Sequence, residues 1–88
     1  MAQLRLQSHL LEWREVDGEV IALEHQRSAY LGTNRTGTVL WQALAEGSSE
    51  PELAELLVNE YGVDADAARA DVGRFVTQLT EQGLLERG

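Results

Sequence analysis

Apolar and polar residues alternate along two segments near the start of the chain, a pattern that predicts strands with one buried face. These segments are residues 11–16 (LEWREV) and residues 19–24 (EVIALE), and Asp17 and Gly18 lie between them. An Asp-Gly pair in this position favours a two-residue hairpin turn, because both of its residues tolerate a positive φ. The pattern therefore predicts a β-hairpin over residues 11–24.

A third strand is expected directly after the hairpin. The polar residues 25–28 form a turn, residues 29–31 (AYL) are mainly apolar, and Gly32 ends the segment. Residues 4–6 (LRL) alternate as well, which predicts a further short strand or an extended arm. We therefore expect a small antiparallel sheet over about residues 4–31, with its third strand at an edge.

In the remaining two thirds of the chain, apolar residues recur at the three- to four-residue spacing of amphipathic helices. Asn34, Ser49 and Asp64 are suitable N-caps, and Ser49 begins the capping box SEPE, which places a proline in the first turn. The predicted helices cover about residues 34–46, 50–61 and 64–82. An N-terminal three-stranded antiparallel sheet followed by three helices is a winged-helix-like α+β fold.

Length and composition restrict the classes of function. The 88 residues suffice for a single domain over 1–88, and no apolar run approaches the roughly 20 residues that span a bilayer. Fifteen acidic and seven basic residues give a net charge of −8, which disfavours nucleic acid and anionic membranes as partners. With no signal peptide, and with no cysteine that would call for an oxidising compartment, we expect a cytoplasmic protein.

The residue types needed for catalysis do not occur in productive arrangements. The two histidines, His9 and His25, have no neighbour at metal-ligand spacing, so both are expected at the surface. The serines lack a G-x-S-x-G setting, and no glycine segment matches the phosphate loop GxxxxGK[ST]. The sequence therefore predicts no catalytic residue, no metal site and no cofactor, and it disfavours an enzyme.

Three segments from the third predicted strand onward carry a resemblance to a known family. They are YLGTNRTGTVLW from Tyr30, PELAELLVNEYGVDADAARADV from Pro51, and LTEQGLL from Leu79. In this order and spacing the chain resembles the PqqD-like family, the modules also called RiPP recognition elements, which bind the leader segments of ribosomally made precursor peptides. The resemblance covers about residues 10–86. One departure is Thr33, where the family usually has leucine. The matching positions are Tyr30, Asn34, Thr36, Gly37, Trp41, Glu60, Tyr61, Val63, Asp64, Asp71, Val72, Gly83, Leu84 and Leu85.

The resemblance implies a stand-alone adaptor that binds a precursor leader peptide and delivers it to a separate leader peptidase or other maturation enzyme. Such members occur in lasso peptide biosynthesis, which we favour, and beside radical-SAM enzymes, which is the alternative. Two further alternatives follow from the fold alone: a winged-helix regulator that binds DNA, and a scaffold subunit that associates through its edge strand. The acidic third helix argues against the regulator, because phosphate contacts require cations.

The resemblance also places the peptide along the third strand, facing the third helix. An edge strand offers unpaired amides and carbonyls to which an extended peptide adds as another strand. Ala68 is small, so we expect it to leave room for a ring of the peptide, whereas Val72 and Leu79 also fit a purely structural role. Trp41 and Tyr61 are expected in the core. The expected peptide-binding residues are Ser28, Ala29, Tyr30 and Leu31 on the strand, and Ala68, Asp71, Val72, Phe75, Gln78 and Leu79 on the helix.

Overall fold

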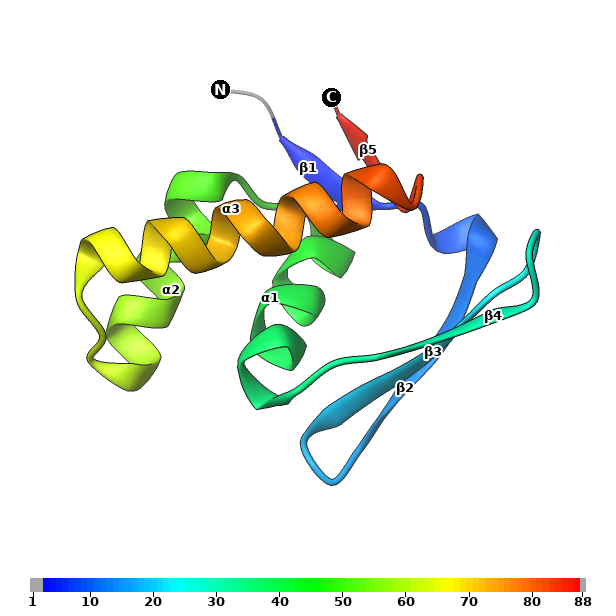
Figure 1. Cartoon of the computed structure of the whole chain (residues 1–88), viewed down its shortest axis with the longest axis horizontal. Helices are drawn as coiled ribbons and strands as arrows, with labels where there is room; N and C mark the ends of the chain where they lie inside the picture. The colour runs from blue at the N-terminus through cyan, green and yellow to red at the C-terminus, as the bar shows by residue number, and fades with distance from the viewer. Residues whose placement is uncertain (1–2, 88) are drawn as a thin grey trace.

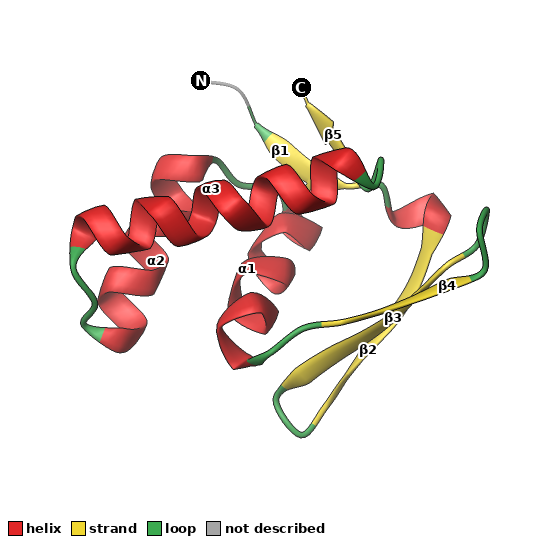
Figure 2. Ribbon diagram, in the orientation of Figure 1, coloured by secondary structure: helices red, strands yellow, loops and turns green. Residues whose placement is uncertain are grey.

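The computed structural model describes residues 3–87, and it confirms the winged-helix-like α+β fold (Figures 1 and 2). A three-stranded antiparallel sheet precedes three helices, and α1 lies between that sheet and α2. The elements are β1 (Leu4–Leu6), the 3-10 helix η1 (Ser8–Leu10), β2 (Leu11–Val16), β3 (Glu19–Glu24), β4 (Ala29–Gly32), α1 (Arg35–Glu46), α2 (Glu50–Tyr61), α3 (Ala65–Glu81) and β5 (Leu85–Arg87).

The sheet has the strand order β2-β3-β4, so β4 lies at an edge, as the sequence predicts. The turn between β2 and β3 is formed by Asp17 at φ 53° and Gly18 at φ 80°. Positive φ at both positions gives the backbone twist that matches the twist of the flanking strands. The Asp-Gly hairpin is therefore confirmed.

The two ends of the described chain form a second, separate sheet. β1 pairs with β5 in antiparallel fashion, with Leu6 opposite Leu85 (Figure 2). Residues 4–6 thus form a strand, but they do not extend the three-stranded sheet. Leu84 and Leu85 are buried in the core, and the pairing of β5 with β1 is a feature that the sequence pattern does not predict.

Side-chain caps define the starts of all three helices. The Oδ1 atom of Asn34 accepts a hydrogen bond from the Gly37 amide at 2.8 Å, and the Ser49 hydroxyl accepts one from the Glu52 amide at 3.3 Å. Asp64 accepts bonds from two amides of the first turn of α3. These bonds satisfy backbone donors that a helix leaves unpaired at its N-terminus, and they confirm the predicted caps.

The core lies where α1 meets the sheet and the other two helices. Trp41 is fully buried, and its ring meets that of Trp13 edge to face, with 6.0 Å between the centroids. Trp13 therefore faces inward. The expectation that Tyr61 is a core residue is wrong, because its side chain is 45% exposed. Tyr61 is the last residue of α2, and the chain reverses at Gly62, so only part of its ring is covered.

Candidate peptide-binding site

Within residues 3–87 no strand pairs with the outer edge of β4, and the register of β4 identifies the amides that this edge presents. The Thr33 amide donates to the Val20 carbonyl at 3.0 Å, and Leu31 lies opposite Ala22 in the same ladder. Because antiparallel pairs alternate, the amides and carbonyls of Ala29 and Leu31 also point toward β3. Those of Tyr30 and Gly32 then point away from the sheet. The edge therefore offers the backbone groups of two residues to a further strand.

A row of α3 residues lies beside this edge. A hollow of about 410 Å³ has Gly32 at the end of β4 on one side and Asp71, Phe75 and Gln78 of α3 on the other. Asn34, two residues after Gly32, also lines this hollow. This hollow is rimmed by polar side chains, so it suits a polar or charged side chain of a bound peptide.

A smaller hollow of about 100 Å³ lies beside the other end of β4 and is mainly apolar. Ala29 and Leu31, on the inner face of β4, line it together with Leu84 and with Gln82 at the end of α3. Along α3, residues 71, 75, 78 and 82 are spaced as one helix face. Both hollows therefore follow the same face of α3, and we refer to them together as the β4–α3 groove.

The position of Phe75 in the groove depends on Gly37. A Cβ atom at Gly37 would lie 3.3 Å from Cε1 of Phe75 and 3.0 Å from Cβ of Thr33. Glycine is thus the residue that lets the half-buried Phe75 ring approach the first turn of α1 this closely. This contact gives a physical reason for glycine at position 37.

Thr33 takes part in a network of hydrogen bonds where β4 leads into α1. Its hydroxyl lies 2.8 Å from that of Thr38 and accepts a bond from the Val20 amide at 3.1 Å. The Thr38 hydroxyl accepts from the same amide and donates to the Asn34 carbonyl. The junction between β4 and α1 is therefore fixed by polar contacts, and the end of the groove is anchored to β3.

A buried carboxylate joins the turn before β4 to the end of α3. Glu24 is 2% exposed, and its oxygens accept bonds from the amides of Gln26 and Arg27, at 3.1 and 2.9 Å, and from Nε of Arg27. The Arg27 guanidinium in turn donates to the Gln82 carbonyl at 2.6 Å. Burial raises the pKa of Glu24, but the two amides and the guanidinium outweigh it and hold that pKa below its usual range. We call this unit the Glu24–Arg27 clamp; it fixes the distance between β4 and α3 at the smaller hollow.

The structure divides the predicted site residues into two groups. Asp71, Phe75 and Gln78 lie in the groove with Ala29 and Leu31, and the Tyr30 side chain is 77% exposed on the opposite face of the sheet. Ser28 is exposed in the turn, with φ 51°. The other three predicted helix residues are buried in the core: Ala68, Val72 and Leu79.

The expectation of open space beside Ala68 is wrong, because the core covers this residue completely. A small residue on an amphipathic helix either leaves room or permits close packing, and sequence alone does not separate the two. Conversely, no sequence pattern identifies Arg74, Arg27 or Gln82 as groove residues. Arg27 and Gln82 enter the groove through contacts between segments 55 residues apart, which no local pattern encodes.

The part of the chain that the structure describes has no cluster of metal-binding side chains and no helix suited to span a membrane, and its two histidines lie at the surface. Residues 3–87 contain no group of three or more His, Cys, Asp or Glu side chains placed to hold a metal ion. His9 is exposed, and His25 lies 3.8 Å from Glu12 at the surface, as expected for both histidines. No helix within this range is long and apolar enough to cross a membrane.

Comparison with known proteins identifies the family. Two solved structures share the fold: "TbiB1 in Complex with the TbiA(beta) Leader Peptide", with a TM-score of 0.85, and "Lasso peptide synthetase B1 complexed with the leader peptide", with 0.81. Each is 28% identical to this chain, and the matches cover 93% and 94% of this chain and 94% and 96% of theirs. No curated protein matches the sequence. The sequence model of coenzyme PQQ synthesis protein D matches residues 19–85, more than half of the chain, and the chain therefore belongs to the PqqD family.

Proposed function

We propose that this chain is an adaptor that binds the leader segment of a ribosomally made precursor peptide and delivers it to a separate leader peptidase in lasso peptide biosynthesis. The observation that carries the proposal is the unpaired edge of β4 beside the β4–α3 groove. Both similar structures contain a leader peptide, and both share more than nine tenths of their length with this chain. One of them is described as a lasso peptide synthetase B1, which favours the lasso setting over presentation to a radical-SAM enzyme.

In the β4–α3 groove, backbone groups supply affinity and the two hollows supply specificity. The backbone groups of Tyr30 and Gly32 pair with any extended peptide, so they supply affinity without selecting a sequence. The apolar hollow at Ala29 and Leu31 selects an apolar side chain, and the polar hollow, lined by the Asp71–Arg74 ion pair, accepts a polar or charged one. Leader residues that occupy the two hollows then determine which precursor is bound.

The charge distribution on α3 argues against the DNA-binding alternative. Its two arginines, Arg69 and Arg74, form ion pairs within the helix with Asp66 and Asp71. A recognition helix that enters a DNA groove needs cations available for phosphate, and here an aspartate accompanies each cation. The acidic balance of the chain, −8 overall, acts in the same direction.

A reconstituted cleavage assay tests the proposal. We expect the cognate precursor to keep its mass when incubated with this chain alone, and to lose its leader when the cognate peptidase is added. Omitting this chain should slow that cleavage strongly, because the peptidase then has to find the leader unaided. Cleavage that proceeds at the same rate with and without the chain, or a mass change without the peptidase, would refute the adaptor role.

A further inference from the structure

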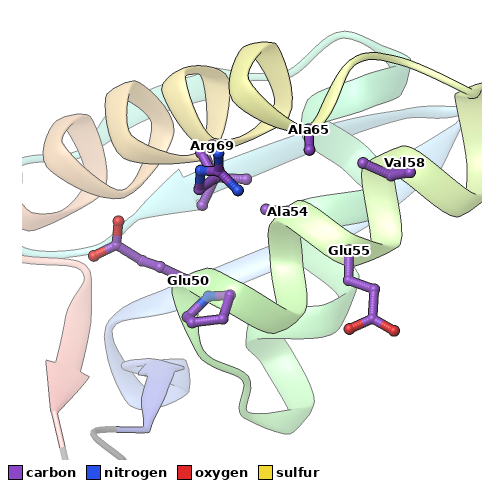
Figure 3. Close-up of a pocket in the computed structure, with 8 residues that line it drawn as sticks. Glu50, Ala54, Glu55, Val58, Ala65 and Arg69 are labelled. Atoms are coloured by element: carbon purple, nitrogen blue, oxygen red, sulfur yellow. The ribbon is translucent and has the colours of Figure 1, made fainter.

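A further hollow, of about 440 Å³, lies between α2 and α3 (Figure 3). Its floor is apolar and consists of Pro51, Ala54 and Val58 from α2 and Ala65 and Val72 from α3. It shares no lining residue with the β4–α3 groove, and the sheet contributes nothing to it. We call it the α2–α3 groove.

The shape of this groove follows from the residues at the helix contact. Figure 3 shows Ala54 and Ala65 directed into the space between the two helices, where small side chains leave the floor recessed. On α2 the lining positions from Pro51 to Val58 recur every three to four residues, and they span about 10 Å at 1.5 Å per residue. The recess therefore has the length of about two helical turns.

The groove is suited to a helix rather than to an extended peptide or a small polar ligand. α2 and α3 satisfy their backbone groups internally, so they provide no ladder for an added strand. An apolar partner segment must then satisfy its own backbone, as an amphipathic helix does. Sites for small molecules place a few polar groups inside the cavity, whereas here Glu50 and Glu55 extend away from the floor on the α2 side (Figure 3), and the Arg69 guanidinium is paired with Asp66.

The charges along the two edges specify the partner further. Glu50 and Glu55 lie on the α2 side, and within the described residues neither takes part in an ion pair. Arg69, on the α3 side, is paired with Asp66. A docking helix that places basic residues along the α2 side would therefore gain attraction to two carboxylates that have no cation of their own.

Exposed apolar surface continues beyond the end of the groove. Tyr61 follows Val58 by one helical turn and is 45% exposed, and Val63 precedes Ala65 by two residues and is 38% exposed. Neither residue belongs to the β4–α3 groove, so leader binding does not account for their exposure. A partner that docks along α2 would cover both.

We propose that the α2–α3 groove docks an amphipathic helix of the maturation enzyme, with its apolar side on the groove floor and basic residues against Glu50 and Glu55. The identity of this partner rests on the proposed function. Residues 65, 69 and 72 lie on a different face of α3 from residues 71, 75, 78 and 82, so leader and enzyme occupy the chain at the same time.

Paired substitutions at exposed positions test this surface, with the purified cognate leader peptidase of the proposed function as the probe. Ala65→Trp fills the groove and should weaken peptidase binding about tenfold, the effect of losing one anchoring contact. Glu55→Lys should weaken it about threefold, most strongly at low salt. The matched controls, Ala70→Trp and Glu60→Lys, change exposed residues of the same helices that do not line the groove.

Each variant is also titrated with labelled leader peptide and melted thermally, which separates this proposal from the adaptor proposal. We expect all four variants to stay folded and to bind the leader like the wild type. If Ala65→Trp and Glu55→Lys bind the peptidase as tightly as their controls, the groove proposal is overturned. It is also overturned if the wild type binds the leader but not the peptidase. Failure of the wild type to bind the leader would instead refute the adaptor proposal.

Discussion

The register of β4 predicts that proline impairs different properties at two adjacent residues, leader binding at Tyr30 and folding at Leu31. The Tyr30 amide points away from the sheet, so Tyr30→Pro removes a donor that is available to the leader and leaves the ladder with β3 intact. The Leu31 amide points toward Ala22, so Leu31→Pro removes a donor within the sheet. One substitution should therefore impair binding, and the other should impair folding.

The magnitudes follow from one hydrogen bond in each case. Leaving a buried carbonyl of the leader without its partner costs about 1–3 kcal/mol. At 1.4 kcal/mol per factor of ten, this corresponds to an affinity loss of roughly 5- to 150-fold for Tyr30→Pro. Leu31→Pro should lower the free energy of unfolding by a similar amount, because one hydrogen bond of the sheet is lost. The loss of the half-buried leucine side chain should lower it further.

Two controls isolate the amide from the side chain. Tyr30→Ala removes the exposed ring and keeps the amide, so the difference between Tyr30→Pro and Tyr30→Ala reports the backbone donor. Gly32→Pro and Gly32→Ala form a second pair at the other outward amide, where a Cβ atom meets no neighbour within 4 Å. The assay is a fluorescence anisotropy titration with labelled leader, accompanied by a thermal melt of every variant. Equal affinity of folded Tyr30→Pro and Tyr30→Ala would refute pairing at this amide.

Three further predictions concern the groove wall and its supports. Ala68→Trp should lower the free energy of unfolding by about 1–3 kcal/mol or more, because the core already encloses Ala68 completely; a wild-type melting temperature would contradict this. Phe75→Ala should weaken leader binding by about 1–3 kcal/mol while costing less stability than the roughly 3–5 kcal/mol of a fully buried ring, and unchanged affinity in folded protein would show that Phe75 is structural only. Glu24→Gln should remove an acid-sensitive part of the stability: the folded-state pKa of Glu24 is lowered, so its contribution is complete above the ordinary glutamate pKa of about 4.3 and is lost as the pH falls through the lowered value. Urea melts of both proteins over this pH range should converge at acid pH, and parallel curves would refute the Glu24–Arg27 clamp.

Local sequence features predict the parts of the fold that depend on neighbouring residues. The Asp-Gly turn and the caps at Asn34, Ser49 and Asp64 are confirmed because each uses groups within a few residues of itself. The edge position of β4 is also confirmed, since a short strand that leads directly into a helix has only its preceding strand as a sequential neighbour.

Features that depend on distant segments do not follow from the sequence pattern. β5 forms only because β1, some eighty residues earlier, lies beside it, and three residues of alternating character do not reveal that partner. Whether Ala68 is buried or lines a cleft depends on how closely its neighbours pack. The outward direction of the Tyr30 amide depends on the register of β4 with β3. The family resemblance therefore indicates one strand and one helix as the candidate site, whereas the side chains that meet between them follow from the structure.

Backbone hydrogen exchange, measured by NMR with and without the leader peptide, tests the central claim most directly. In the free protein the amides of Ala29 and Leu31 should exchange slowly, because they bond to β3, and those of Tyr30 and Gly32 should exchange rapidly. Saturating leader should protect Tyr30 and Gly32 and leave the other two largely unchanged. Rapid exchange of both Tyr30 and Gly32 in the saturated complex would contradict the addition of the leader to the edge of β4.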